Sequence, residues 1–460
     1  MRDIIITLVF FGAIPAVFKW PWTGILLFSW ISYMNPHRLT YGFAFTFQYA
    51  LIAALVTIIA FTINRDPKKF PITPVTGLLI LFILWTSITT TTALAPENAM
   101  EQYTKFVKIQ LMTFLTLALI NTREKINWLV IMIVISLGFY GVRGGTFTIL
   151  TGGNWRVWGP PGTFFGDNNH LALTLIMTMP FMHYLQLIAT NKWVRHLLSV
   201  VMLLTLAAII GTYSRGALLA LAAMSGVLWL RSSRKLPVAV AAVICIAGLL
   251  TFMPQKWFDR MDTINSYEED ESASGRLDAW LFAINVANDK MLGGGFKVNT
   301  REDLWQIYNP ESPIVRAPHS IYFEVLGEHG YIGLTIFLSL YFTAMLTCSR
   351  TVKLTRHRPD LKWAGDLSKM MQVSMVGYAA AGAFLNLSTF DLFYHVLAIV
   401  VMARLIVRNE LKKTSTASEA ENAPDEGTGD KTFDAAGKRK GMPGPKPVLG
   451  GASGYLIKRR

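Results

Sequence analysis

The sequence predicts an all-α, polytopic integral membrane protein with about twelve transmembrane helices and one long external loop. Three observations support this fold class. Of the 460 residues, 52% are hydrophobic and only 16% are charged, and the mean hydropathy is +0.39, above the range of soluble domains. Apolar runs of about 20 residues, the length that crosses the hydrocarbon core of a bilayer, recur along the chain. One long polar segment, residues 254–320, interrupts these runs.

Eleven apolar segments have the length and composition of membrane crossings. They are residues 44–63, 75–94, 104–120, 126–142, 169–189, 195–212, 215–231, 236–253, 321–349, 370–388 and 391–408. Two shorter runs, 4–18 and 21–34, precede them. We expect these runs to form either one broken crossing or a tight pair of short helices, because Pro15, Pro21 and Pro36 interrupt helical structure. No small-residue cleavage site follows the first run, so we expect no cleaved signal peptide.

The chain is strongly basic, with a formal net charge of +14. Such a charge could indicate nucleic-acid binding. The basic residues, however, cluster in short loops between apolar segments, which is the pattern of the positive-inside rule. We therefore expect membrane lipids and no nucleic acid as partners. The two cysteines, Cys245 and Cys348, lie inside apolar runs and predict neither a disulfide framework nor a metal site.

One set of loops carries most of the basic residues and is expected to face the cytoplasm. It contains Arg65, Lys68, Lys69, Arg123, Lys125, Lys192, Arg195, Arg231, Arg234, Lys235 and the segment 350–362. These loops alternate along the chain with residues 95–103, 143–168 and 254–320, which should therefore lie outside. The acidic run 268–271 falls in the last of these outer loops.

The segment from about residue 411 to 460 differs from the rest of the chain. It is rich in Ser, Thr, Ala, Gly, Pro and charge, and it has no helical period. Such a composition is typical of disorder. We expect a disordered cytoplasmic tail after a membrane domain of residues 1–410, with its basic end close to anionic lipid headgroups.

Several arginines are expected on the outer side, where the positive-inside rule predicts few. They are Arg143, Arg156, Arg215, Arg276 and Arg316. Arg215 stands in a very short turn between two apolar segments. Inserting an arginine at the bilayer centre costs a free energy of roughly 2.5–3.5 kcal/mol on insertion scales. It must lie at the interface, snorkel, or meet an anion. Guanidinium groups bind phosphate oxygens in a bidentate manner, so these arginines favour an anionic ligand such as a diphosphate.

His319 is the main candidate for proton transfer. It follows Pro318 at a junction between loop and helix, three residues after Arg316, in the long outer loop. An imidazole near its ordinary pKa can take a proton from a sugar hydroxyl. The alternative is a purely structural histidine at a helix start.

Two further patterns are weaker. Glu324, Glu328 and His329 follow His319, but they form neither an HExxH pair nor a His/Cys cluster, so they do not predict a metal site. The segment GGGF at 293–296 could cradle a phosphate through its backbone, but it lacks the Lys and Ser/Thr of a P-loop.

Together these residues resemble the O-antigen ligase and polymerase superfamily. SGRLDAWLFAINVANDKMLGGGF (274–296), followed by APHSIYFEVLGEHGYIGL (317–334), has an arginine and a tryptophan ahead of a glycine-rich turn, and then a histidine before Gly-x-x-Gly. TYSRG (212–216) is similar to the Ser-Arg-Gly motif, and GTFFGDNNHLA (162–172) to the Gly-Thr-Phe and Asn region. The N-terminal part, with WPWTGILLFSWISYMNPHR (20–38), resembles the extension of the O-glycosylation ligase branch.

This resemblance covers about residues 1–410 and implies a membrane-embedded glycosyltransferase without cofactor. Such enzymes transfer a glycan from undecaprenyl diphosphate, on the periplasmic face of the bacterial inner membrane, to an acceptor such as the lipid A–core oligosaccharide. The implied reaction is metal-independent and inverting, with His319 as general base and Arg215 holding the diphosphate. The implied substrate-binding residues are Arg143, Arg316, Arg276, Asn169 and Trp280. This chain has His-Ser at 319–320 where many members have His-Asn, which leaves the acceptor contact open.

Three alternatives remain open from the sequence. A polymerase of the same superfamily would extend a lipid-linked glycan, and a protein O-oligosaccharyltransferase would use a Ser or Thr hydroxyl as acceptor. A lipid or glycan transporter is the third. Transporters place charged residues near the bilayer midplane, often in two similar halves, whereas the polar residues here lie at helix ends on one side.

Overall fold

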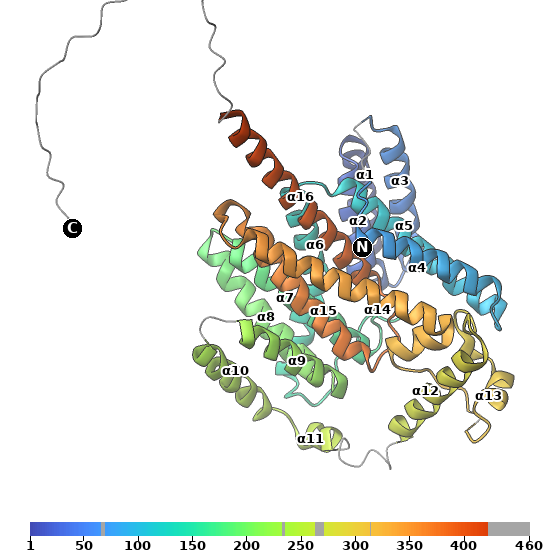
Figure 1. Cartoon of the computed structure of the whole chain (residues 1–460). Helices are drawn as coiled ribbons and strands as arrows, with labels where there is room; N and C mark the ends of the chain where they lie inside the picture. The colour runs from blue at the N-terminus through green and yellow to red at the C-terminus, as the bar shows by residue number, and fades with distance from the viewer. Residues whose placement is uncertain (66–69, 232–234, 263–270, 313, 422–460) are drawn as a thin grey trace, which may run out of the picture. The chain divides into compact units, whose positions relative to one another are not determined.

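The structure is a computed structural model that describes residues 1–65, 70–231, 235–262, 271–312 and 314–421 (Figure 1). Lys68, Lys69, Arg234 and the acidic residues 268–270 lie outside the described residues, as does the segment 422–460. The last helix continues to Glu421, so residues 411–421 are helical and not disordered as expected. Disorder of residues 422–460 stays a prediction.

The described residues fold into α-helices, short 3₁₀ turns and irregular segments, and residues Met1–Leu411 form one compact unit. The elements are α1 (Arg2–Lys19), α2 (Trp22–Met34), η1 (Pro36–Leu39), η2 (Phe43–Phe45), α3 (Tyr49–Ile63), α4 (Pro74–Thr91), α5 (Pro96–Leu119), α6 (Arg123–Leu150), α7 (Asn168–Ile188), α8 (Lys192–Gly211), α9 (Arg215–Arg231), α10 (Lys235–Leu250), α11 (Gln255–Asp262), α12 (Glu271–Asp289), η3 (Val298–Thr300), α13 (Glu302–Tyr308), α14 (Ile321–Thr355), η4 (Pro359–Leu361), α15 (Lys362–Gly382) and α16 (Asp391–Glu421).

Within the described part of the chain, five helices are long and apolar enough to cross a membrane, namely α4, α6, α7, α8 and α14. Residues Tyr49–Ile63 and Arg215–Leu230 form shorter apolar helices. A helix rises 1.5 Å per residue, so a crossing of the roughly 30 Å hydrocarbon core takes about 20 residues. The all-α fold is therefore confirmed for the described residues, and the five long apolar helices are consistent with a multi-pass membrane protein. The count of about twelve crossings and the side of the long loop stay predictions.

The N-terminal runs form a tight pair of short helices, α1 and α2, rather than one broken crossing. Near the start of α1, the carboxylate of Asp3 accepts a hydrogen bond from the backbone N–H of Ala44 at 3.1 Å. The hydroxyls of Thr7 and Tyr49 lie 2.6 Å apart, which fastens α1 to the beginning of α3. Contrary to the sequence-based expectation, Pro15 lies inside α1 without ending it. The start of α1 therefore lies beside the segment that follows α2, so these helices run in opposite directions.

Helix α6 is longer than the sequence predicts, because glycines that resemble loop signals serve its packing against α8. An added Cβ at Gly141 would lie 2.2 Å from Oγ1 of Thr205, and one at Gly145 would lie 2.0 Å from the carbonyl oxygen of Leu204. Small residues at such positions let two membrane helices approach closely. Arg143 accordingly lies within α6, and does not end it as expected.

Helix α14 is broken at Gly330, which has a φ of 67° and a ψ of −175°. The break disrupts the helical hydrogen-bond ladder there, so carbonyls just before it accept hydrogen bonds from another segment. The N–H of Gly294 donates to the carbonyl of Gly327, and that of Gly295 to the carbonyl of Glu328, each at 2.8 Å. The glycine-rich turn 293–296 is thus fastened to α14, and its amides are not a phosphate cradle.

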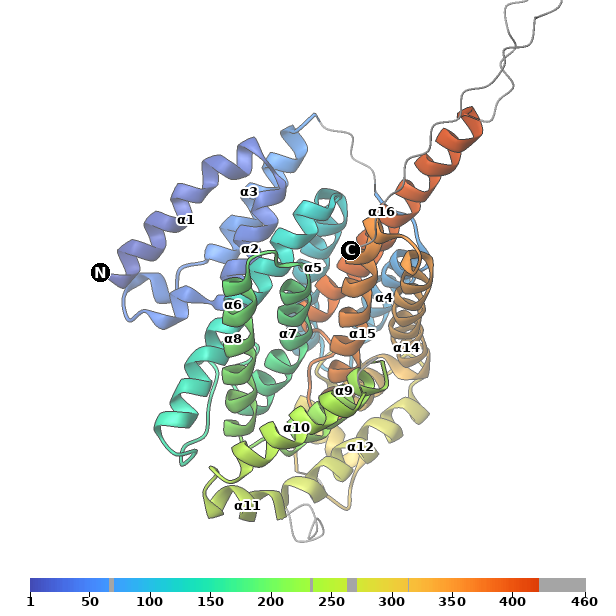
Figure 2. The same cartoon turned by 90° about the vertical axis from the view of Figure 1, so that its left-hand side faces the viewer.

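The segment 95–103 and the long polar segment also differ from the sequence-based expectation. Residues 95–103 are mostly the beginning of α5, which starts at Pro96, a residue favoured in the first helical turn. The long polar segment is also structured, since it contains α11, α12, η3 and α13. Helix α12 packs against α14, and α15 packs against α7, α9 and α14; Figures 1 and 2 both show α14 and α15 side by side. This packing brings the long segment onto the membrane helices.

Candidate functional site

His319 stands at the junction that precedes α14, in a backbone conformation that few non-glycine residues adopt. Its φ is 43°, in the left-handed region. The indole nitrogen of Trp280 donates a hydrogen bond to the carbonyl oxygen of Pro318 at 2.7 Å. The Trp280 ring also stacks on Phe323, with centroids 4.6 Å apart and planes 11° from parallel. Residues from α12 and α14 thus hold the backbone on which the imidazole is presented.

The surroundings of His319 lower its pKa below the ordinary value for histidine. The largest cause is partial loss of hydration, because protein atoms surround the ring although it keeps access to solvent. The positive charge of Arg276 lowers the pKa further, His170 adds to this effect, and Asp167 opposes it. A neutral imidazole is therefore favoured near pH 7, as a general base requires. These same interactions bring Arg276, His170 and Asp167 into electrostatic range of His319.

The start of α7 is tied to the turn that carries Arg215. Asp167 caps the helix by accepting a hydrogen bond from the backbone N–H of Asn169 at 2.8 Å. The side-chain amide of Asn168 donates to the carbonyl oxygen of Thr212 at 2.7 Å, three residues before Arg215. Asn169 is half-buried, and its amide lies 3.4 Å from the side-chain oxygen of Asn168. The asparagines therefore connect the surroundings of His319 to the start of α9.

Arg215 is the first residue of α9 and is half-buried. The next residue, Gly216, packs on Phe384, since an added Cβ would lie 3.2 Å from the Cβ of that side chain. Two residues earlier than Phe384, an added Cβ at Gly382 would lie 2.7 Å from Cδ1 of Ile321. The starts of α9 and α14 consequently meet at the end of α15. This places Arg215 and His319 at the same end of the helix bundle.

Arg316 and Arg276 are neighbours across the long segment. The guanidinium of Arg316 lies directly against Gly275, where an added Cβ would come within 1.8 Å of its Nη1 atom. The side-chain amide of Asn299 donates to the carbonyl oxygen of Arg316 at 3.1 Å. Both arginines are half-buried. The fold therefore brings together Arg276 and Arg316, which are 40 residues apart in the sequence.

Arg143 and Arg156 lie elsewhere. Both line a cavity of about 1180 Å³ between α1, α6 and the segment 156–161, and the lining of this cavity includes none of the four residues Arg215, Arg276, Arg316 and His319. The sequence predicted that all these arginines face outward, but it did not predict how they are arranged within the plane of the membrane. The fold separates them into two groups.

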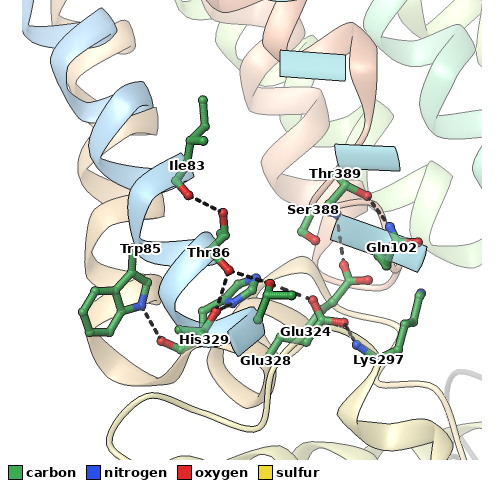
Figure 3. Close-up of polar contacts among 12 residues, drawn as sticks. Ile83, Trp85, Thr86, Gln102, Lys297, Glu324, Glu328, His329, Ser388 and Thr389 are labelled. Atoms are coloured by element: carbon green, nitrogen blue, oxygen red, sulfur yellow. Dashed lines mark hydrogen bonds and ion pairs between the residues drawn. The ribbon is translucent and has the colours of Figure 1, made fainter. Parts of the chain in front are cut away.

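A buried polar cluster lies one to two turns into α14 (Figure 3). The carboxylate of Glu328 accepts a hydrogen bond from the backbone N–H of Lys297 at 2.8 Å. The carboxylate of Glu324 accepts one from the backbone N–H of Ser388 at 3.0 Å. The positive charge of Lys297 acts on both carboxylates and also on His170. The charged side chain of Lys297 therefore lies within electrostatic range of His170, one of the neighbours of His319.

His329 has a structural environment. Its Nδ1 atom lies 2.7 Å from the hydroxyl of Thr89, and its carbonyl accepts a hydrogen bond from the indole of Trp85 at 2.9 Å. Trp85 and Thr89 belong to α4, so the contacts fasten that helix to the break in α14 (Figure 3). Among the described residues, no three His, Cys, Asp or Glu side chains converge as a metal site would require.

Lys297 is the residue of this region that the sequence did not single out. It stands two residues after the glycine triplet 293–295, and its φ of 59° places it in the left-handed region. Glu328, which accepts the hydrogen bond from the Lys297 backbone, stands thirty-one residues later in the sequence. A separation of this length does not form a recognisable sequence motif. Its electrostatic relation to Glu324, Glu328 and His170 exists only in the folded chain.

Two stretches of the chain match known families. Residues 200–338 match the family described as O-antigen ligase. Residues 1–190 match a family of unknown function, DUF5935. No curated protein matches the chain at a significant level. The first match contains Arg215, Arg276, Arg316 and His319, and it confirms the resemblance to the O-antigen ligase and polymerase superfamily.

Proposed function

Because residues 200–338 match the O-antigen ligase family, we propose that this multi-pass membrane protein is an O-antigen ligase-like glycosyltransferase. It transfers a glycan from undecaprenyl diphosphate to a lipid A–core acceptor at the periplasmic face of the bacterial inner membrane. The observation that carries the proposal is the convergence of Arg215 and His319 at one end of the helix bundle, with Arg276 acting on His319.

In this proposal His319 is the general base. Its lowered pKa keeps the imidazole neutral, so a ring nitrogen can accept the proton of an acceptor hydroxyl. As that proton leaves, the acceptor oxygen forms a bond to the anomeric carbon of the donor sugar. The bond between this carbon and the diphosphate oxygen breaks on the opposite face, and the electron pair stays on the diphosphate. The configuration at the anomeric carbon is inverted, without a metal.

The arginines stabilise the charge that develops on the leaving diphosphate. Arg215 is the main contact in this proposal, because a planar guanidinium fits two phosphate oxygens at once. Arg276 and Arg316 adjoin His319 and supply further positive charge. Preorganised cations of this kind stabilise a transition state more than the ground state when charge grows as the reaction proceeds. Lys297 extends the same positive region towards His170.

The remaining candidates have supporting roles in the proposal. Asn169 adjoins the Asp167 cap near His319, where its amide can bind a sugar hydroxyl or a phosphate oxygen. The indole nitrogen of Trp280 already donates a hydrogen bond to Pro318, so we propose that Trp280 positions His319. The edge of its ring can still contact a sugar. Arg143, in the separate cavity, is not part of this catalytic group.

Orientation in the membrane follows from charge. Arg123 opens α6 on the expected cytoplasmic side, and the start of α7 follows on the opposite side after one crossing. Asp167 and His170, at that start, are the electrostatic neighbours of His319. The proposed site therefore faces the periplasm, where lipid-diphosphate-linked glycans are used by enzymes of this kind.

Reconstitution of the purified chain in lipid bilayers tests the function. The bilayers contain undecaprenyl diphosphate-linked glycan and lipid A–core oligosaccharide, and products are separated by size and lipid anchor. We expect glycan on the lipid A–core. A longer lipid-linked glycan would identify a polymerase, and glycan on an added protein acceptor would identify an O-oligosaccharyltransferase. Movement of the donor across the bilayer without any new glycosidic bond would indicate a transporter.

A further inference from the structure

The N-terminal helix pair and α6 enclose a cavity of about 1180 Å³ that is lined by four arginines. They are Arg2 of α1, Arg38 of η1, Arg143 of α6 and Arg156 of the following segment. None of the residues that line the cavity is an aspartate or a glutamate. No ion pair between described residues involves any of these four arginines. The cavity therefore holds positive charge that the described protein does not neutralise.

Aromatic rings support two of the arginines. The guanidinium carbon of Arg38 lies 4.8 Å from the ring centroid of Phe45. That of Arg156 lies 5.7 Å from the ring centroid of Tyr213. Such cation–π contacts hold a guanidinium in place without cancelling its charge. Arg38 and Arg156 are thus positioned to bind an anion.

The position of Arg143 along α6 fixes the depth of the cavity in the membrane. Arg123 begins this helix on the expected cytoplasmic side, and Arg143 lies 20 residues further along it. At 1.5 Å per residue this separation is about 30 Å, the thickness of the hydrocarbon core. The cavity consequently lies at the outer headgroup region, where the positive-inside rule gives no reason for four arginines.

Besides the arginines, the cavity is lined by large apolar side chains that are exposed at the surface. Ile5 keeps 57% of its surface exposed and Phe139 keeps 37%. Phe139 precedes Arg143 by four residues of α6, so it lies about 6 Å nearer the membrane centre. An apolar side chain on the membrane side of the arginines, such as Phe139, would meet lipid chains. A ligand that satisfies both features has a charged head, for the arginines, and a hydrocarbon tail, for these side chains.

We propose that this cavity is a binding site for a membrane lipid with a phosphate-bearing headgroup, separate from the group around His319. Guanidinium groups of Arg38 and Arg143 bind the phosphate oxygens, and the hydrocarbon chain lies along Phe139 and Ile5. The inference goes beyond the transferase proposal, because it concerns residues largely outside the O-antigen ligase match and needs no glycan transfer.

Lipid binding by the purified full chain tests this inference. Native mass spectrometry from detergent, at increasing ionic strength, counts the phosphatidylglycerol retained per protein. The test variant is Arg38→Gln/Arg143→Gln. The matched control is Lys290→Gln/Arg301→Gln, which removes the same charge from two exposed cations that are already paired with Asp289 and Asp303.

We expect the test variant to bind phosphatidylglycerol more weakly by on the order of tenfold, and the control to bind as the parent does. Salt should weaken the parent's binding, since the arginines are solvent-accessible. Equal retention by the test variant and the parent, or equal loss in the control, overturns the proposal. Arg143→Gln alone is the fallback if the double variant does not fold, because Arg143 is exposed and its substitution leaves the core intact.

Inorganic pyrophosphate distinguishes a lipid from a free anion. If the ligand is a lipid, Phe139→Ala should reduce phosphatidylglycerol retention while leaving weak pyrophosphate binding unchanged. If pyrophosphate binds the parent as tightly as the lipid does, and Phe139→Ala has no effect on either, the apolar wall is irrelevant and the lipid assignment is wrong. The readout in every arm is binding, so it does not depend on transferase activity.

Discussion

The indole nitrogen of Trp280 donates a hydrogen bond to the carbonyl oxygen of Pro318, 2.7 Å away, directly before His319. Trp280 belongs to α12, and His319 lies 39 residues later in the same polar segment, just before α14. The position of the imidazole therefore depends on the position of helix α12. His319 keeps a φ of 43°, a conformation that costs free energy unless its surroundings impose it.

Trp280→Phe should separate positioning from folding. The phenyl ring can still stack on Phe323, but the donor to Pro318 is lost, at a cost of about 1 kcal/mol in the free energy of unfolding. Because a small misplacement of a base slows catalysis strongly, we expect kcat to fall about tenfold or more with little change in KM. Steady-state kinetics and the thermal midpoint measure the two effects. An unchanged kcat would remove the positioning role.

Arg276→Gln should change the pH dependence of transfer. In the native protein, loss of hydration and the charge of Arg276 lower the pKa of His319, so the base stays neutral to lower pH than an ordinary histidine. Activity is present above that pKa and is lost as pH falls through it. Removing the positive neighbour raises the pKa of His319 towards its usual range, so the acid limb of kcat/KM should move to higher pH.

The control for this experiment is Arg301→Gln, which removes a charge that is paired with Asp303 in the same polar segment. We expect its pH profile to match that of the parent. If Arg276→Gln and Arg301→Gln leave the acid limb at the same pH, Arg276 does not act on the catalytic base.

Arg215→Lys should abolish transfer although it keeps the charge. A lysine offers a point charge, whereas the proposed contact to the diphosphate requires the planar, bidentate guanidinium. Initial rates at saturating donor, with protein levels in the membrane held equal, measure the effect. Full activity in Arg215→Lys would favour an arginine that only snorkels to the interface.

Gly330→Ala should destabilise the fold. The break in α14 holds Gly330 at a φ of 67°, and an added Cβ would lie 2.5 Å from the carbonyl oxygen of Met291. We expect a loss of roughly 1–3 kcal/mol from backbone conformation alone, with the steric clash in addition. Gly226→Ala is the matched control, because nothing lies within 4 Å of an added Cβ there. In a helix this control should be neutral or stabilising by up to about 1 kcal/mol. Unfolding in detergent compares the two.

Much of the helical layout was predictable from the sequence. The prediction of crossings at 169–189 and 195–212 agrees closely with Asn168–Ile188 and Lys192–Gly211, because a membrane crossing is marked by a long apolar run between charged residues. The limit of such reasoning appears at Gly145. A glycine in the sequence can indicate either a loop or a close contact between helices. At Gly145 it is a helix contact, which only the packing of α8 against it reveals.

The candidate site was predictable in part. Residue type and position along the chain indicated His319 and the outward arginines. They did not indicate that Arg143 and Arg156 lie apart from Arg276, since alternation of loops gives the side of the membrane but no lateral position. Lys297 was missed because its relation to Glu328 depends on the broken helix and not on sequence spacing.

Transfer by His319→Ala in reconstituted bilayers tests the central claim most directly. The matched variant is His357→Ala, an exposed histidine in the loop that precedes α15 on the expected cytoplasmic side. Both proteins are first compared for thermal midpoint and for insertion into the membrane. We predict that His319→Ala forms no glycosylated lipid A–core while His357→Ala transfers at the parental rate. Parental transfer by a folded, inserted His319→Ala protein would contradict the account.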